Sequence, residues 1–255
     1  MTARRLEGRT AIITGGAGGI GAATGRLFCE HGASVALVDL EESPLSEVAA
    51  DIREKVPGAQ VLEIRADVGI EHSATAIVQQ VLTKFGTLDV LVNLAGIRSY
   101  EPLAEAKAET WDRILKANLL SYAYMAREAL PALRKSGRGS IVNISSTHAV
   151  NPRAGMGQYD VTKAGILSMT RTLAFEEAPH KVRVNAVCPG LTLTPFHVKR
   201  LQRTQEDLLS EKSVYNLQQR WAEPREVAHP IVWLASDEAS FITASTIMVD
   251  GGQHV

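Results

Sequence analysis

The sequence predicts an α/β fold built on a doubly wound, seven-stranded parallel sheet with helices on both faces. Short apolar runs rich in β-branched residues alternate along the chain with longer stretches of helical period. Several of the short runs are apolar throughout, which is typical of strands buried on both faces of a parallel sheet. The alternation of strand and helix indicates βαβ crossovers, and such crossovers produce a doubly wound sheet.

The individual elements follow from these two periods in chain order. Seven apolar runs are predicted to be strands: Thr10–Thr14, Ser34–Asp39, Val61–Arg65, Leu88–Asn93, Ser140–Ser145, Val182–Val187 and Thr246–Val249. Six stretches of helical period lie between them: Ile20–His31, Pro44–Lys55, Glu71–Phe85, Thr110–Lys135, Gln158–Glu177 and Pro224–Ser236. The polar stretch Pro189–Arg220 shows neither pattern, and irregular segments of this length are usually lids or binding loops.

Composition and charge fit one globular domain over residues 1–255. Hydrophobic residues make up 45% of the chain, and 27 Lys and Arg stand against 28 Asp and Glu, so the net charge is −1. A chain of this charge gives no reason to expect nucleic acid or an anionic membrane as a partner. Cys29 and Cys188 have neither a disulfide framework nor metal-ligand spacing, so no metal is expected.

Targeting signals are absent from the sequence pattern. The first residues, MTARRLEGRTAIITGG, are interrupted by charges and lack the apolar region of a signal peptide. No window approaches the ~20 apolar residues of a membrane span. We therefore expect a cytoplasmic protein.

A glycine-rich turn follows the first predicted strand and opens the first predicted helix. Residues Thr14–Gly21 contain the spacing G-x-x-x-G-x-G, which lets a pyrophosphate approach the backbone and the helix N-terminus. Asp39 ends the second predicted strand, where its carboxylate can accept hydrogen bonds from ribose hydroxyls and repel a 2′-phosphate. No Lys or Arg follows directly, since the next residues are Leu40, Glu41 and Glu42. The pattern therefore predicts NAD as cofactor in preference to NADP.

A phenol and an ammonium stand one turn apart on the predicted helix Gln158–Glu177. Tyr159 and Lys163 occupy positions i and i+4 and so share a face of that helix. We expect the ammonium to lower the pKa of Tyr159 from its usual ~10, which suits a general acid or base. Ser146 closes the fifth predicted strand, at the end where open α/β sheets bind ligands.

With further motifs, these features closely resemble the short-chain dehydrogenase/reductase family, in its single-domain Rossmann-fold branch. The matching segments cover essentially the whole chain: Thr14–Gly21 (TGxxxGIG), Asp67-Val68, Asn93–Gly96 (NNAG), Asn118, Ser146, Tyr159, Lys163, Pro189-Gly190, Arg220–Ala228 and Val249–Gly252. Leu94 replaces the second Asn of the NNAG motif, and we expect this departure to be tolerated.

The resemblance implies roles for individual residues. It assigns a catalytic tetrad of Asn118, Ser146, Tyr159 and Lys163. It assigns cofactor contacts to Gly15, Gly19, Ile20, Gly21, Asp39, Leu40, Asp67, Val68, Asn93, Ala95, Gly96, Tyr159, Lys163, Pro189, Gly190, Thr192 and Thr194. In the family's mechanism, Ser146 hydrogen-bonds the substrate oxygen and Tyr159 takes the hydroxyl proton as hydride leaves for the nicotinamide. Lys163 holds the ribose and Asn118 anchors a water, while Ser145 is interpreted as structural.

Three residues fall where the family builds its substrate pocket: Arg98, His148 and Arg153. Each can equally be a solvated loop residue. If two or more of them point inward, the pocket is polar and suits hydroxylated or anionic substrates.

Two surfaces are expected to have functions beyond the chemistry. The helices Thr110–Lys135 and Gln158–Glu177 are apolar around most of their circumference, which suggests a subunit interface. The family pairs these helices, so we expect a homotetramer, with a dimer as the alternative. The segment at about 193–217 is expected to form a substrate lid, whereas a rigid excursion held by subunit contacts is the other possibility.

Three functions are compatible with the sequence. The first is an NAD-dependent oxidoreductase that interconverts a secondary alcohol (a polyol, sugar or hydroxy-acid-like compound) and its ketone. The second is a 3-oxoacyl thioester reductase of the same family, which would favour NADP and a basic surface. The third is a non-catalytic dinucleotide-binding regulator, which need not keep the four residues of the tetrad.

Overall fold

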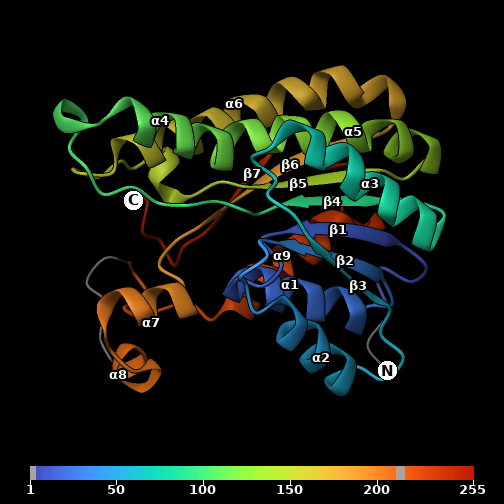
Figure 1. The fold of residues 1–255 in the computed structure, drawn as a ribbon, viewed down its shortest axis with the longest axis horizontal. Coiled ribbons are helices and arrows are strands. Elements are labelled where there is room, and N and C mark those ends of the chain that lie inside the picture. The colour runs from blue at the N-terminus through green and yellow to red at the C-terminus, as the bar shows by residue number, and fades with distance from the viewer. Residues whose placement is uncertain (1–3, 211–215) are drawn as a thin grey trace.

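A seven-stranded parallel sheet forms the centre of the molecule in the computed structural model, which describes residues 4–210 and 216–255. The strands are β1 (Thr10–Thr14), β2 (Ser34–Asp39), β3 (Val61–Arg65), β4 (Val90–Asn93), β5 (Ser140–Ile144), β6 (Arg183–Pro189) and β7 (Thr246–Val249). They are ordered β3-β2-β1-β4-β5-β6-β7, and every pair is parallel (Figure 1). The predicted fold class is confirmed.

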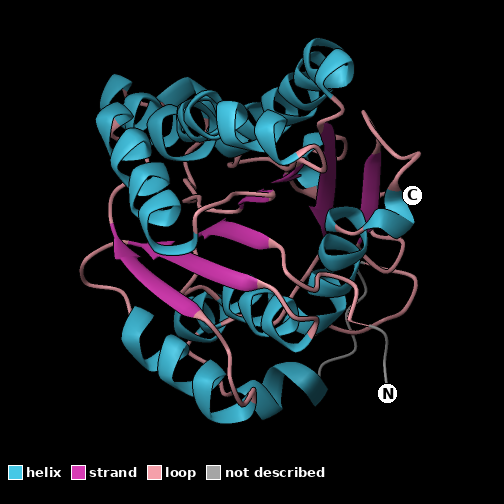
Figure 2. Ribbon diagram, turned by 90° about the vertical axis from the view of Figure 1, so that its right-hand side faces the viewer, coloured by secondary structure: helices cyan, strands magenta, loops and turns pink. Residues whose placement is uncertain are grey.

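Helices cover both faces of this sheet. Their bounds are α1 (Gly19–Glu30), α2 (Leu45–Lys55), α3 (Glu71–Phe85), α4 (Ala108–Leu115), α5 (Ser121–Ser136), α6 (Gly157–Glu177), α7 (Pro195–Leu201), α8 (Gln205–Ser210) and α9 (Pro224–Ala235). One layer contains α1, α2 and α9, and the other contains α3, α5 and α6, with the twisted sheet between them in Figure 2. Both faces of the inner strands β1, β2, β4, β5 and β6 are therefore buried, whereas the edge strands β3 and β7 are only partly buried.

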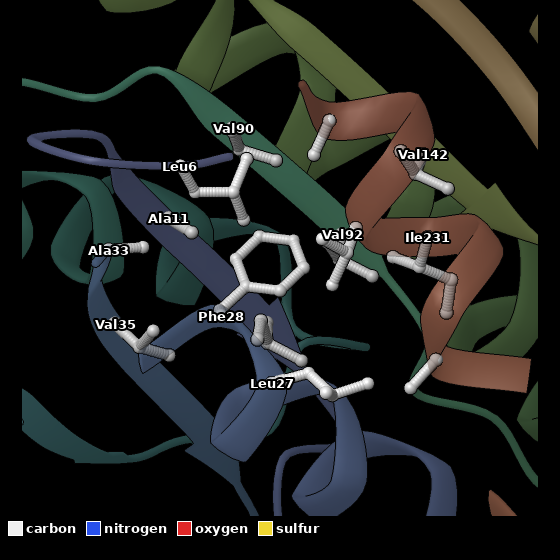
Figure 3. Packing of buried hydrophobic residues seen from close by; sticks show 14 of the residues in the cluster. Leu6, Ala11, Leu27, Phe28, Ala33, Val35, Val90, Val92, Val142 and Ile231 are labelled. Carbon is white, nitrogen blue, oxygen red and sulfur yellow. The ribbon is translucent and has the colours of Figure 1, made fainter. Parts of the chain in front are cut away.

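The hydrophobic core lies between the sheet and these layers. On the α1–α9 side, the ring of Phe28 is fully buried and packs among side chains from β1, β2, β4 and α9, including Ala11, Val35, Val92 and Ile231 (Figure 3). A second buried cluster on the opposite face joins α3, α5 and the sheet. The two cores hold the sheet rigidly, so its edge can position a site.

The helix expected over Thr110–Lys135 is not one regular helix, and that prediction is wrong in detail. Between α4 and α5 the chain makes a π-helical turn at Lys116–Leu120. The turn buries the Asn118 side chain completely, and its amide bonds the backbone of Ile97. Helical periodicity does not reveal such a turn, since the apolar residues on both sides keep their spacing. Turns of this kind are frequent at functional sites.

The strand order reverses between β1 and β4, which opens a crevice at their C-terminal ends. The Thr14 hydroxyl links the two ends, because it accepts hydrogen bonds from the backbone N–H groups of Leu94 (3.0 Å) and Ala95 (3.2 Å). Beyond β6, the stretch expected to be irregular contains the two short helices α7 and α8, which project beside the sheet (Figure 1). Residues 211–215, inside the predicted lid at 193–217, lie outside the described residues.

Candidate active site

A cleft of about 530 Å³ runs along the C-terminal ends of the strands. It extends from the glycine-rich turn, past the end of β2, to the segment that leads into α7. Most of the residues expected to contact the cofactor line it: Gly15, Gly19, Ile20, Asp39, Leu40, Asp67, Val68, Ala95, Gly96, Tyr159, Lys163, Pro189, Gly190, Thr192 and Thr194. The catalytic candidate Ser146 lines it as well.

The glycine-rich turn leaves its backbone open at one end of this cleft. Gly15 has φ +68°, and a Cβ placed there would lie 3.0 Å from the backbone of Ala95. Gly21 does not line the cleft, since a Cβ on it would lie 2.0 Å from the carbonyl oxygen of Gly15. Gly21 therefore allows α1 to start tightly against the turn, whereas Gly15 keeps the cleft wall narrow.

Asp39 lies at the far side of the turn with both carboxylate oxygens fixed. Its Oδ2 accepts a hydrogen bond from the backbone N–H of Ala17 at 2.9 Å, and its Oδ1 accepts one from Leu40 at 2.8 Å. Lone pairs remain on both oxygens for hydroxyl donors. Arg65 is the cross-strand neighbour of Asp39, but its guanidinium bonds the carbonyl oxygens of Glu41 and Ser43, and it does not line the cleft.

Asn93 lies behind the cleft. Its side chain is 1% exposed, and its Nδ2 donates to Oδ1 of Asn143 at 3.0 Å. The Asn93 side chain therefore does not reach the cleft, and it cannot make the expected contact with the cofactor in this structure. Asn93 instead ties β4 to β5 beneath the site.

Tyr159, Lys163 and Ser146 meet where β5 ends and α6 begins. Tyr159 is 7% exposed and Lys163 is 4% exposed. Nζ of Lys163 donates to the carbonyl oxygen of Ile144 at 2.9 Å and lies 5.6 Å from the centre of the Tyr159 ring. Burial, helped by the charge of Arg98, lowers the pKa of Lys163 to about 7. Lys163 is therefore an ammonium that can lose its proton near neutral pH.

The expectation that Lys163 lowers the pKa of Tyr159 is not what the structure shows. Burial raises the pKa of Tyr159, and the main opposing influence is the positive charge of Arg98. The Arg98 guanidinium lies over the Tyr159 ring, 5.4 Å from its centre. The i, i+4 spacing places Lys163 one helical turn from Tyr159. It cannot show that Arg98, which lies on a loop, has the larger effect on the pKa of Tyr159.

Ser146 and Ser145 have different partners. The Ser146 hydroxyl oxygen accepts a hydrogen bond from the backbone N–H of His148 at 3.1 Å, and the same hydroxyl hydrogen-bonds the Tyr159 side chain, which opposes the rise in the pKa of Tyr159. The Ser145 hydroxyl donates to the backbone oxygen of Lys163 at 2.7 Å. Ser145 thus tethers α6 to β5, while Ser146 faces both cavities.

Asn118 lies behind these residues and outside the cleft lining. Its Oδ1 accepts from the Ile97 N–H at 2.7 Å, and its Nδ2 donates to the Ile97 oxygen at 2.9 Å and to the Thr162 hydroxyl at 3.2 Å. The side chain is thereby committed to fixing the loop after β4.

A second cavity of about 160 Å³ adjoins the cleft, and Ser146 lies in the wall that they share. Arg98, His148 and Arg153 all line this cavity, beside Tyr100, Met156, Leu191, His197, Arg200 and Gln253. Burial lowers the pKa of His148, whose Nδ1 lies 3.1 Å from the Asn151 oxygen. This neutral imidazole packs edge-on against the Tyr159 ring.

Sequence reasoning missed His197, which links the two cavities. Burial, together with the charges of Arg98 and Arg200, lowers the pKa of His197 to about 4, so its ring is neutral. Its Nε2 lies 3.3 Å from Nη1 of Arg98, and its Nδ1 lies 3.0 Å from the Thr194 hydroxyl. An arginine can only donate, so Nε2 accepts and Nδ1 carries the hydrogen.

Arg200 and Gln253 were missed for a similar reason. Arg200 reaches the cavity from the end of α7 and lies over the Tyr100 ring, 4.9 Å from its centre. Gln253 returns from the C-terminal segment, and its Oε1 accepts from the Leu191 N–H at 2.9 Å. The only local signal was that Arg200 and His197 follow the Pro189-Gly190 motif closely. Nothing in the sequence pairs Gln253 with that loop.

The described residues show neither a metal cluster nor a membrane helix. Within residues 4–210 and 216–255, no three His, Cys, Asp or Glu side chains gather in a way that could hold a metal ion. Over the same residues, no helix has both the length and the apolar character needed to cross a bilayer.

Comparison with known proteins places the chain among nicotinamide-dependent enzymes. The family model described as enoyl-(acyl carrier protein) reductase matches residues 15–254. The chain is 38% identical over 248 residues to a 3-oxoacyl-[acyl-carrier-protein] reductase of Thermotoga maritima, covering 97% of this chain and 98% of that protein. It is also 38% identical to a cis-4-hydroxycyclohexanecarboxylate dehydrogenase of Sinomonas cyclohexanicum, with 96% of each chain covered.

A solved structure matches the whole fold. It is an L-sorbose reductase from Gluconobacter frateurii in complex with NADPH and L-sorbose. The match has a TM-score of 0.93 and 34% sequence identity, and it covers 99% of both chains.

Proposed function

The chain belongs to the short-chain dehydrogenase/reductase family, an oxidoreductase family that uses a nicotinamide dinucleotide, and on this premise we propose that it interconverts a secondary alcohol and its ketone with NAD. The observation that carries the proposal is the position of Tyr159 and Ser146. Tyr159, Ser146 and Lys163 all line the long cleft, and Ser146 also lines the small cavity beside it. A hydroxyl group held in the small cavity therefore faces an acid–base side chain and the cofactor cleft together.

The end of the cleft near the glycine-rich turn fits the pyrophosphate and the adenosine ribose of a dinucleotide. The open backbone at Gly15 and the start of α1 suit a pyrophosphate, and Asp39 suits ribose hydroxyls. The wall around Asp39 contains Leu40, Ser43, Asp67 and Val68, and none of the described residues that line it there is Lys or Arg, which supports NAD over NADP. The related L-sorbose reductase is known with NADPH, so the choice of cofactor is a property of each member.

The residues of this chain divide the chemistry between them. When bound, the nicotinamide supplies the hydride acceptor or donor. Ser146, whose oxygen accepts from His148, donates its hydroxyl hydrogen to the substrate oxygen in place of its present contact with Tyr159. Tyr159 Oη takes up or returns the hydroxyl proton. Lys163, whose pKa is about 7, holds a proton near Tyr159 and presents an ammonium to the cleft.

The experiment that tests this function is a substrate screen. Secondary alcohols, sugars and hydroxy acids are assayed for NADH formation, and we expect turnover of at least one class with NAD. Absence of NADH with every compound would overturn the proposal.

The second candidate is a 3-oxoacyl thioester reductase, favoured by the similarity to the Thermotoga maritima enzyme. It would appear as reduction of a 3-oxoacyl thioester with NADPH in place of alcohol oxidation.

We propose that the protein is a homotetramer. The outer face of α6 exposes Val161 by 50% and Phe175 by 80%, and Phe241 is fully exposed beside the edge strand β7. Exposed apolar groups of this size commonly mark interfaces. Light scattering should give close to four times the 27.5 kDa of one chain, and Phe175→Asp should reduce that mass. A mass of one chain at micromolar concentration would contradict the proposal.

We propose that the segment 193–217 acts as a lid, of which Leu193–Ser210 and Asn216-Leu217 are described. This segment places Thr194 on the cofactor cleft and His197 on both cavities. Hydrogen exchange should be fast across Leu193–Ser210 in the free protein and slow with cofactor and substrate bound. Equal protection in both states would leave a rigid excursion as the correct description.

We also propose a cytoplasmic location. Both thiols, Cys29 and Cys188, are free and buried, which suits a reducing compartment.

A further inference from the structure

We propose that the substrate carries a carboxylate close to its reacting carbinol carbon, and that Arg98 binds this carboxylate. The inference rests on the proposed function and names the substrate class for the same site. Arg98 follows the end of β4 and lines both the cleft and the small cavity. Its guanidinium is held between the rings of Tyr159 and Phe196, 5.4 and 5.2 Å from their centres.

The contacts of Arg98 differ from those of arginines that are paired with a carboxylate. Arg134 and Arg138, for example, pair with the carboxylates of Glu177 and Asp89. Among the described residues, no carboxylate forms an ion pair with Arg98. Its side chain hydrogen-bonds His197, Tyr100 and Tyr159, and it lies against the rings of Tyr159 and Phe196. Because a half-buried guanidinium gains most from an anion, this site is incomplete without one.

The charged side chains among the described residues that line the small cavity are all basic. Arg98, Arg153 and Arg200 all line it, and none of its described lining residues is Asp or Glu. Asp160 accepts a hydrogen bond from the backbone N–H of Arg153 but does not reach the lining. An anion in this cavity therefore meets guanidinium groups among the described lining residues, with the Asp160 carboxylate lying behind the lining.

His197 fixes the guanidinium in the orientation that an anion needs. Its Nε2 accepts from Nη1 of Arg98, and its Nδ1–H donates to the Thr194 hydroxyl. The imidazole is itself held edge-on against the Trp221 ring. Nη1 of the Arg98 guanidinium is thus engaged by His197, and the remaining N–H donors of the guanidinium are held in a fixed orientation. This lowers the entropy cost of binding an anion.

The size of the cavity limits the substrate. A volume of about 160 Å³ resembles that of a ~150 Å³ protein cavity that accepts benzene, so the part of the substrate that lies inside the small cavity has only a few non-hydrogen atoms. The reacting oxygen must lie at Ser146 and Tyr159, while Arg98 lies directly over the Tyr159 ring. The carboxylate and the carbinol carbon must therefore be neighbours or be separated by one carbon, as in an α- or β-hydroxy acid.

The test compares acetoacetate with acetoacetamide, which have nearly the same shape but differ in charge. With NADH as reductant, kcat/KM should be at least ~100-fold higher for acetoacetate, because a desolvated charged pair is worth a few kcal/mol. Arg98→Met should remove most of this preference, chiefly by raising KM for acetoacetate, and Arg98→Lys should restore part of it. Arg113→Gln is the matched control, since Arg113 is exposed on α4 and lines neither cavity.

A binding measurement separates this inference from the proposed function. Malonate is titrated into the protein saturated with NADH, and its affinity is read from the change in NADH fluorescence. We expect malonate to bind, and Arg98→Met to weaken binding at least ~30-fold while NADH affinity stays within a few fold. Equal kcat/KM for acetoacetate and acetoacetamide, or malonate binding unaffected by Arg98→Met, would overturn the carboxylate site. So would tighter binding of inorganic phosphate than of malonate.

The outcomes remain distinguishable if the enzyme proves different from the one proposed. Failure of every alcohol and ketone to react would overturn the proposed function, while malonate binding would still report on Arg98. Turnover of neutral alcohols with no preference for the carboxylate would keep the proposed function and overturn the inference.

Discussion

Tyr159→Phe should lower kcat about 10³-fold, because it removes the group that we propose as general acid and base. The ring remains, so its packing against Ile114 and Met156 is kept. The dissociation constant for NAD should therefore stay within a few fold. Initial rates of NADH formation give kcat, and fluorescence titration gives the affinity for NAD.

Tyr122→Phe is the matched control for this variant. Tyr122 is also buried; its hydroxyl donates to the Ile144 oxygen at 2.9 Å and lies 3.5 Å from Nζ of Lys163. Loss of that bond should cost about 1 kcal/mol of folding free energy and less than tenfold in kcat. A Tyr159→Phe enzyme with kcat within tenfold of the unaltered protein would show that another group carries the proton.

The unaltered protein should use NAD with a kcat/KM at least ~100-fold above that for NADP, since bringing like charges together costs several kcal/mol. The repulsion arises between the 2′-phosphate and Asp39, whose carboxylate is held in place by Ala17 and Leu40. Asp39→Ala should lower the preference at least tenfold by removing the charge. Steady-state kinetics with each cofactor at a fixed substrate concentration measures the ratio.

Glu42→Gln is the control for the change in net charge. Glu42 is exposed, lies three residues after Asp39 and does not line the cleft, so its loss should leave the cofactor ratio within about twofold by the weakness of screened surface charges. Equal use of both cofactors by the unaltered protein would contradict the prediction.

Local patterns were sufficient to predict the scaffold. The bounds of β1, β2, β3, β7 and α3 agree with the sequence prediction residue for residue. These elements have strong periods and clear turn residues on both sides. The fold class and the family follow from the same local patterns, because the glycine-rich turn and the Tyr159–Lys163 pair lie at fixed places on them.

Contacts between distant segments could not be predicted in this way. Arg98, His197 and Thr194 form one hydrogen-bonded chain although almost a hundred positions separate its ends. The π turn at Lys116–Leu120 was missed because the apolar spacing continues through it. The pKa of Tyr159 was misjudged because burial and a loop arginine decide it, and neither is visible in an i, i+4 spacing.

The start of α7 rests against the glycine-rich turn. A Cβ on Gly19 would lie 2.9 Å from Cγ2 of Thr194, and three residues further on His197 holds Arg98. A ligand that fixes this arrangement from one cavity reduces the free energy needed to fix it from the other. Such coupling is reciprocal: the factor by which the dinucleotide tightens carboxylate binding equals the factor by which the carboxylate tightens dinucleotide binding. The two affinities therefore belong to one thermodynamic cycle, and α7 is the element that couples the two sites.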